Sequence, residues 1–186
     1  MSDSAETLKA EIERLAAELQ AWRARAEAAE RLADRDALTG VLNRRGFDQA
    51  LSAGMAYARR HGVPAALLYL DLDGFKTIND GLGHAAGDAA LIGVARLLEA
   101  NLRESDSVAR LGGDEFAVLL LNADQAAARA KAEALARALG DEGFEWEGER
   151  RPLGGSFGVR AFTGQAAPQD WLAEADAAMW VRKRER

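Results

Sequence analysis

The feature that most constrains the fold is a short apolar run that ends in two carboxylates. Residues 65–70 are apolar or aromatic, and Asp71-Leu72-Asp73 follows them directly. The run is far shorter than the roughly 20 residues of a membrane helix and is bounded by turn residues, which predicts a buried strand over 65–73. Because strand side chains alternate between faces, Asp71 and Asp73 share one face and Leu72 lies on the other.

The chain after residue 36 alternates between helical and strand patterns. We expect helices over 45–60, 75–82, 87–102, 123–139 and 168–184, and further strands over 108–111, 116–121 and 153–162. This order predicts an α/β (α+β) sandwich, in which helices cover the faces of a mostly antiparallel sheet.

The segment before this domain has a coiled-coil pattern. Residues 5–35 contain no Gly or Pro and are rich in Ala, Glu, Arg and Leu, which predicts one long helix. Apolar side chains follow the heptad spacing at Leu8, Ile12, Leu15, Leu19, Trp22, Ala26, Ala29 and Ala33. The alternative is a lone amphipathic helix that packs on its own domain. We favour a parallel coil that dimerises residues 1–35 and is followed by one domain over residues 36–186.

Composition excludes several classes of function. The chain has no cysteine and two histidines, which excludes thiolate chemistry and disulfides and argues against a multi-histidine metal site. A net charge of −6 argues against a nucleic-acid partner, although a small anion could find a local cationic pocket. No apolar segment is long enough to span a membrane and no secretory signal is recognisable, so we expect a cytoplasmic protein.

A glycine turn offers a second pair of carboxylates. Gly112-Gly113-Asp114-Glu115 separates two expected strands, which predicts a hairpin. If this hairpin pairs beside strand 65–73, Asp71 and Asp114 could together hold hard divalent cations. Taken singly, each carboxylate would be explained as a solvated strand-end or turn residue. Their combination favours a cation site.

Four ordered motifs carry a family resemblance. The segment RLGGDEF at 110–116 resembles the signature of the GGDEF family, the diguanylate cyclases. The family's other motifs match DALTGVLNRR at 36–45, DLDGFKTIND at 71–80 and GHAAGD at 83–88. The resemblance covers about residues 34–185 and implies a nucleotidyl-cyclase or ferredoxin-like βαββαβ core.

The resemblance implies an activity and a metal site. Family members condense two GTP molecules into cyclic di-GMP and release two pyrophosphates, with two domains facing each other. By similarity, Asp71, Asp114 and the Leu72 carbonyl hold two Mg²⁺ ions per active site, with Mn²⁺ as the alternative ion. Asp114 and Glu115 are the implied catalytic residues, and Glu115 is expected beside the metals, where it would aid deprotonation.

The same resemblance assigns the substrate contacts. Backbone at a helix N-terminus and lysine side chains would hold the phosphates, while the glycine turn lets the backbone approach the nucleotide. An amide can serve guanine O6, and a carboxylate can accept from N1–H and N2–H₂. The implied residues are Gly74, Phe75, Lys76 and Lys183 for the phosphates, Gly112 and Gly113 for the approach of the backbone to the nucleotide, and Asn79 and Asp88 for the guanine.

Two further segments bear on regulation and affinity. Arg103 and Asp106 match the family's RxxD site, at which cyclic di-GMP inhibits its own synthesis, and the alternative for this pair is a surface ion pair. At the C-terminus Lys183 matches a phosphate-contacting lysine, but the sequence stops before the arginine that usually follows. The basic residues there could instead complement the helix dipole.

We therefore expect an active diguanylate cyclase with GTP as substrate, dimerised by its N-terminal coil and inhibited by its product. One alternative is a catalytically weak GGDEF domain that acts as a cyclic di-GMP receptor through Arg103 and Asp106. Another is a coiled-coil interaction module with a passive GGDEF domain. An intact set of Asp71, Asn79 and Asp88 argues against both, because a passive domain has no need of it.

Overall fold

The structure is a computed structural model that describes residues 11, 14–22 and 33–184. The chain divides into two compact units, residues 1–34 and 35–186. Nowhere in the described ranges is a helix both long enough and apolar enough to cross a membrane.

The first unit contains a helical stretch with an exposed apolar stripe. Residues 14–22 are helical, and 50% of Leu15, 51% of Leu19 and 67% of Trp22 is exposed. Arg14 pairs with Glu11 and Glu18 of the same helix, at spacings of three and four residues that face each other on an α-helix. The heptad positions Leu8, Ile12, Ala26 and Ala29 lie outside the described residues, and the coiled coil stays a prediction.

The second unit is built on a four-stranded antiparallel sheet. Its strands are β1 (Ala65–Asp73), β2 (Ser107–Gly112), β3 (Glu115–Leu121) and β6 (Gly154–Ala161). Their order is β2-β3-β1-β6, so β1 lies in the middle with the hairpin partner β3 on one side and β6 on the other. This topology confirms the expected βαββαβ core.

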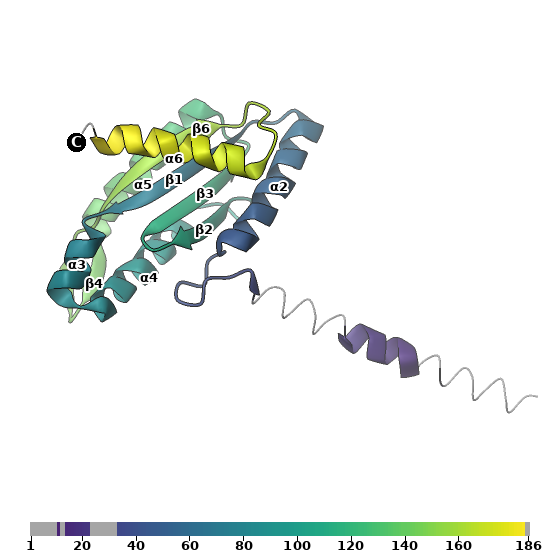
Figure 1. The fold of residues 1–186 in the computed structure, drawn as a ribbon, viewed down its shortest axis with the longest axis horizontal. Helices are drawn as coiled ribbons and strands as arrows, with labels where there is room; N and C mark the ends of the chain where they lie inside the picture. The colour runs from purple at the N-terminus through teal and green to yellow at the C-terminus, as the bar shows by residue number, and fades with distance from the viewer. Residues whose placement is uncertain (1–10, 12–13, 23–32, 185–186) are drawn as a thin grey trace, which may run out of the picture. The chain divides into compact units, whose positions relative to one another are not determined.

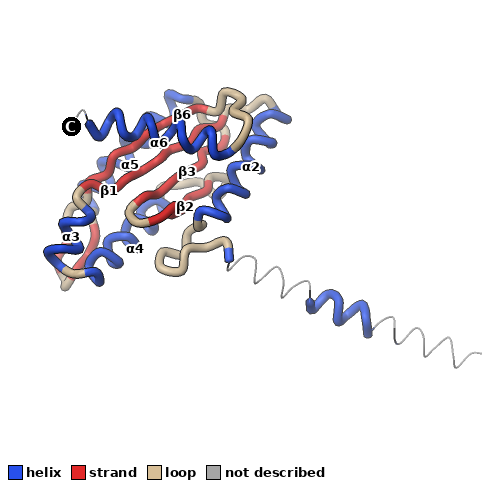
Figure 2. Tube along the Cα trace, viewed as in Figure 1, coloured by secondary structure: helices blue, strands red, loops and turns tan. Residues whose placement is uncertain are grey.

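Helices cover both faces of this sheet (Figures 1 and 2). On one face lie α2 (Arg44–His61) and α6 (Pro168–Arg184), and on the other lie α4 (His84–Ala100) and α5 (Gln125–Glu142). The short helix α3 (Phe75–Leu82) follows the end of β1 and packs on α4.

Local sequence signals fix where several helices begin. The Asn43 side chain caps α2 by accepting a hydrogen bond from the Gly46 N–H at 3.0 Å, and Asp124 caps α5 through the Ala127 N–H at 2.8 Å. Both are residue types preferred at this position because a short polar side chain can satisfy an otherwise unpaired N–H group.

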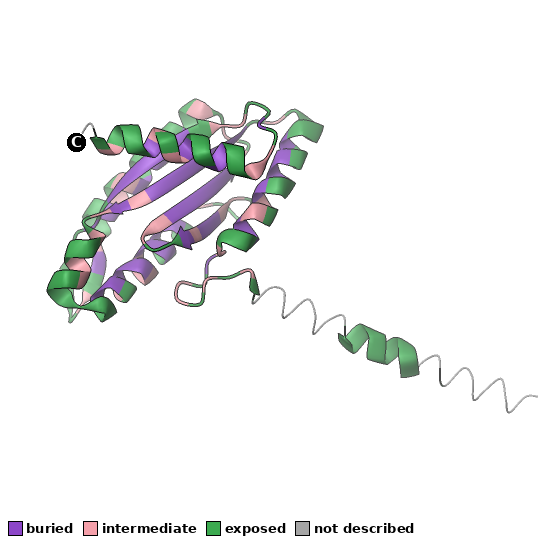
Figure 3. Ribbon diagram, in the orientation of Figure 1, coloured by how far each residue is buried: buried purple, intermediate pink, exposed green. Residues whose placement is uncertain are grey.

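Each face of the sheet has its own core, as the buried strands beneath exposed outer helix faces show (Figure 3). Leu68, Leu70 and Leu72 of β1 pack toward α4 and α5. Leu67 and Tyr69 pack toward α2 and α6. The alternation of β1 side chains is therefore confirmed.

Some helix bounds and one pair of strands differ from the sequence-based expectation; helix α5, for example, ends at Glu142 and not at position 139. Helix α4 begins at His84, three residues before the expected start at position 87. A second, two-stranded sheet of β4 (Phe144–Trp146) and β5 (Glu149–Arg151) was not expected. Its turn places Glu147 and Gly148 at φ 52° and 78°, a two-residue hairpin that the Glu-Gly pair could have signalled.

Candidate functional site

The acidic site lies where β1 ends beside the β2–β3 hairpin. Asp71 faces Glu115 in the antiparallel register, and the Leu72 N–H donates to the Asp114 carbonyl at 3.3 Å. The expected pairing of the hairpin beside β1 is therefore confirmed. It places Asp71 and Leu72 beside Asp114 and Glu115 at one end of the sheet, although the two pairs lie more than 40 positions apart in the chain.

The Lys183 ammonium lies at this acidic site. Lys183 comes from the last turn of α6 and forms an ion pair with the Asp71 carboxylate. The pKa of Lys183 is raised, first by its hydrogen bond to Asp71 and further by the negative charges of Asp71, Asp73 and Asp114, although burial opposes the shift. The negative charges of these carboxylates thus favour a cation at this end of the sheet.

Two buried residues lie beside carboxylates of the site, and sequence reasoning missed both. Ser156 of β6 is 2% exposed, and its hydroxyl donates to Asp73 Oδ1 at 2.9 Å. Tyr69 is buried on the same face of β1 as Asp71, and burial together with the nearby charges of Glu115 and Asp176 raises its pKa. Neither residue lies in a matched motif, and the only available signal was that Tyr69 shares a strand face with Asp71.

The oxygen donors at this end of the sheet suit the expected divalent cation. Among the described residues, no group of three or more His, Cys, Asp or Glu side chains is arranged to hold a metal ion. Mg²⁺ usually takes one or two protein carboxylates and completes its coordination with water and substrate phosphates. Asp71, Asp114 and the Leu72 carbonyl are hard oxygen donors of this kind, and they fit a cation that substrate helps to hold.

The phosphate side of the site is the start of α3. Gly74 adopts the left-handed conformation (φ 71°, ψ 15°) as the N-cap and offers no capping side chain to the first turn. The N–H groups that begin α3 are therefore the type of donor that binds anions at helix N-termini. The expected phosphate residues Phe75 and Lys76 lie in this turn, and Lys76 is exposed.

The glycine turn is held in place by an arginine. Gly113 has φ 51°, a left-handed conformation that a side chain would disfavour. The Arg110 guanidinium donates to the Gly113 carbonyl at 2.9 Å and forms an ion pair with Asp36 at 3.2 Å. Partial burial alone would raise the pKa of Asp36, but hydrogen bonds from Thr39 and the charge of Arg110 lower it.

The expected guanine residue Asn79 lies against Gly87, the residue before the other one, Asp88. Asn79 on α3 reaches Gly87 on α4 because the two helices pack on each other. A Cβ at position 87 would lie 2.0 Å from the Asn79 side-chain oxygen, so only glycine leaves room for this amide. Asp88, the next residue, is exposed.

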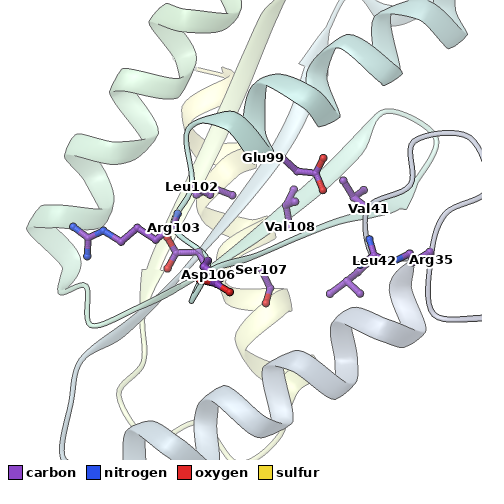
Figure 4. Close-up of a pocket in the computed structure, with 10 residues that line it drawn as sticks. Arg35, Val41, Leu42, Glu99, Leu102, Arg103, Asp106, Ser107 and Val108 are labelled. Atoms are coloured by element: carbon purple, nitrogen blue, oxygen red, sulfur yellow. The ribbon is translucent and has the colours of Figure 1, made fainter. Parts of the chain in front are cut away.

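Arg103 and Asp106 lie apart from the acidic site, beside a cleft of about 440 Å³ (Figure 4). The Asp106 carboxylate accepts hydrogen bonds from the backbone N–H groups of Arg103 at 3.1 Å and Leu121 at 3.2 Å. In the described part of the chain, the Arg103 guanidinium forms no ion pair with Asp106, so the surface ion pair weighed above is absent. Arg35 and Glu99 also line this cleft.

Comparison with a family model matches residues 33–186 to "Diguanylate cyclase, GGDEF domain". The chain is 38% identical over 174 residues to the diguanylate cyclase TpbB of Pseudomonas aeruginosa, covering 90% of this chain and 40% of TpbB. It is 40% identical over 154 residues to the probable diguanylate cyclase DgcE of Escherichia coli, covering 81% of this chain and 14% of DgcE. The chain thus spans less than half the length of these curated relatives.

Solved structures of GGDEF domains have the same fold as this chain. The coiled coil and GGDEF domain of DgcB from Caulobacter crescentus, in complex with cyclic di-GMP, gives a TM-score of 0.83 at 26% identity, covering 96% of this chain and 95% of that one. The isolated GGDEF domain of TpbB gives 0.77 at 39% identity, covering 82% and 90%. With a family model over most of its length and relatives at this identity, the chain belongs to the diguanylate cyclase GGDEF domain family.

Proposed function

We propose that this chain is a diguanylate cyclase, which condenses two GTP molecules into cyclic di-GMP and releases two pyrophosphates. The observation that carries the proposal is the position of Asp71: it is paired with Lys183, lies beside the β2–β3 hairpin that includes Asp114, and is followed by the uncapped start of α3. Carboxylates that can hold a metal ion lie there near cationic and N–H groups that can hold phosphates. A metal-complexed triphosphate needs both kinds of group.

Residues of one domain would bind and orient one GTP. The first-turn N–H groups of α3, with Lys76 and Lys183, would hold the phosphates, and Gly112 and Gly113 would let the backbone approach them. Asn79 would donate its amide to guanine O6, while Asp88 accepts from N1–H and N2–H₂. Adenine presents an amino group where guanine has O6, so this pair favours GTP over ATP.

Asp71, Asp114 and the Leu72 carbonyl would hold divalent cations, and Mg²⁺ suits these hard oxygen donors. Bound Mg²⁺ would neutralise phosphate charge and lower the pKa of the attacking 3′-hydroxyl. Glu115, beside Asp114, would receive the proton of that hydroxyl or hold a water that does.

The reaction needs two loaded domains, because each 3′-hydroxyl attacks the α-phosphate of the other GTP. A coil formed by the N-terminal segment would keep two domains at a high effective concentration. Removing residues 1–33 should then make specific activity depend steeply on protein concentration, while the full chain depends on it weakly. Equal dependence in both proteins would contradict dimerisation through the coil.

The cleft beside Arg103 suits a second, inhibitory role for the product. An exposed guanidinium with no ion-pair partner in the described chain can bond bidentately to guanine O6 and N7. We therefore propose that cyclic di-GMP binds at Arg103 and Asp106 and inhibits its own synthesis. The receptor alternative remains the second candidate function, because this cleft lies apart from the acidic site.

One incubation tests the proposed activity. The full chain is mixed with Mg²⁺ and GTP, or with Mg²⁺ and ATP, and the nucleotides are separated by chromatography. Cyclic di-GMP and pyrophosphate in a 1:2 ratio from GTP, with no cyclic dinucleotide from ATP, is the expected result. Unchanged GTP, together with binding of added cyclic di-GMP, would favour the receptor function instead.

A further inference from the structure

The residue that extends this account is Arg35, which no family motif includes. It is the first residue of the second unit, and it lines the same cleft as Arg103. Figure 4 shows the two arginines at opposite ends of the cleft lining, with Leu42 and Val108 between them. Among the described residues that line this cleft, these two are the only cations.

Hydrogen bonds hold Arg35 at the wall of the cleft. Its guanidinium donates to the Gly40 carbonyl, and the Asn43 side-chain amide donates to the Arg35 carbonyl at 3.1 Å. The loop that these contacts close is tied to β2, since the Leu42 N–H donates to the Val108 carbonyl at 3.2 Å. A guanidinium has five N–H donors. Within the described chain the Arg35 guanidinium uses one Nη group for Gly40 and has its other donors left for a ligand.

The chemistry of the product calls for a second cation in this cleft. Cyclic di-GMP carries its two guanines outside a ring that contains two phosphodiesters, each with one negative charge. Arg103 is proposed to use its donors on a guanine. The cleft is also lined by three carboxylates, those of Glu99, Glu104 and Asp106, which repel a dianion. Arg35 is the cation that remains to offset this repulsion.

We propose that Arg35 forms a phosphate-binding subsite of this cleft, where its guanidinium binds a phosphodiester of cyclic di-GMP while Arg103 binds a guanine. This inference rests on the proposed function, since it concerns the same product in the same cleft. The planar guanidinium matches the oxygens of a phosphate group and can bind two of them at once. Arg103 then selects the base, and Arg35 strengthens binding of the anionic ring.

Calorimetric titration of cyclic di-GMP into the full chain tests the subsite without relying on activity. The proteins are the wild type, Arg35→Ala, Arg35→Lys and Arg150→Ala. Arg150 is exposed on β5 of the second sheet, so it controls for the loss of one positive charge elsewhere. We expect Arg35→Ala to weaken binding about tenfold at low salt, as for the loss of a charge-assisted hydrogen bond. Arg35→Lys should lose less, and Arg150→Ala should stay within about twofold of the wild type.

Salt distinguishes a phosphate contact from a structural role of Arg35. The difference between the wild type and Arg35→Ala should shrink as the salt concentration rises to about 0.5 M, because ions screen an exposed charge pair. A rearranged loop would leave the difference unchanged. Arg35→Ala within about twofold of the wild type at low salt, or a loss that salt does not reduce, would overturn the inference.

Glu99→Gln tests the same charge argument without disturbing the hydrogen bonds of Arg35. Removing this carboxylate should strengthen binding about two- to fivefold, and weaker binding would contradict the argument. Arg103→Ala separates the two levels of the proposal. A wild type that does not bind cyclic di-GMP, or an Arg103→Ala that binds it equally well, would overturn the inhibitory site and the subsite with it. Weak binding in Arg103→Ala but not in Arg35→Ala would overturn the subsite alone.

Discussion

The two faces of β1 differ in where their polarity begins. Toward α4 and α5 the strand presents Leu68, Leu70 and Leu72, all buried to its end. Toward α2 and α6 it presents Leu67 and Tyr69, and then the carboxylates of Asp71 and Asp73.

This difference separates stability from chemistry within one strand. The apolar face continues the core beneath the site and fixes the backbone there. On the other face, the last two side chains are the carboxylates of Asp71 and Asp73, so this end of the strand is charged and less buried. Substitutions on the two faces should therefore affect different measurements.

The largest effect is expected from a carboxylate of the hairpin. Asp114→Ala removes an expected metal ligand and should lower product formation by about a thousandfold or more. Because Asp114 lies in a turn, thermal unfolding should change little. Activity within a few-fold of the wild type would show that product formation does not depend on Asp114. The assignment of Asp114 as a metal ligand would then be wrong.

Arg103→Ala tests the cleft beside Arg103, a polar region that belongs to neither face of β1. Its substitution should affect inhibition and neither stability nor the initial rate. Losing one bidentate contact to guanine should weaken inhibition by cyclic di-GMP about 5- to 150-fold, since such a contact contributes about 1–3 kcal/mol. The initial rate without product should match the wild type. An inhibition curve that does not move would mean that the product binds elsewhere or not at all.

Gly87→Ala tests whether the guanine pair depends on the close approach of α3 and α4. The new Cβ would meet the Asn79 side-chain oxygen, so the amide must turn away. KM for GTP should rise about tenfold, as expected when one hydrogen bond to a nucleobase is lost. Stability should hold or increase slightly, because alanine favours a helix over glycine. An unchanged KM would place guanine recognition elsewhere.

The smallest effect is expected at Asp36, which supports the turn through Arg110. Its pKa is lowered in the folded protein, so its contribution to stability is present at neutral pH and is lost as the pH falls through the folded pKa. Asp36→Asn should lower the free energy of unfolding by about 1–2 kcal/mol at pH 7. The difference between the two proteins should begin to shrink below about pH 4 and disappear once the pH is below the lowered pKa of Asp36. A difference that stays constant down to pH 3 would contradict a charge-based role.

Sequence reasoning predicted the fold well where periodicity is strong. The bounds of β1, α3 and α6 match the expected ranges, because apolar runs and glycine or proline boundaries mark them. The β4–β5 hairpin was missed, since its three-residue strands give too few positions for alternation to be seen.

The site was predictable only in part. Motif residues such as Asp71 and Asp114 could be named, and the hairpin register brings them together as expected. The contact of Ser156 with Asp73 depends on which strands become neighbours and in which register. The periodicity of the sequence predicts which face of a strand a residue occupies, but it does not predict which residue of a neighbouring strand lies beside it.

The most direct test of the central claim compares two adjacent positions on β1. Leu70→Ala and Asp71→Asn are each measured for free energy of unfolding by urea and for product formed from Mg²⁺ and GTP per folded molecule. Leu70 is fully buried, so its loss should cost about 2–5 kcal/mol of stability and leave activity near the wild type. Asp71→Asn should abolish activity and change stability by about 1 kcal/mol or less, because its partner Lys183 is partly exposed. An active Asp71→Asn, or a Leu70→Ala that is inactive while folded, would contradict the separation of stability and chemistry between the two faces.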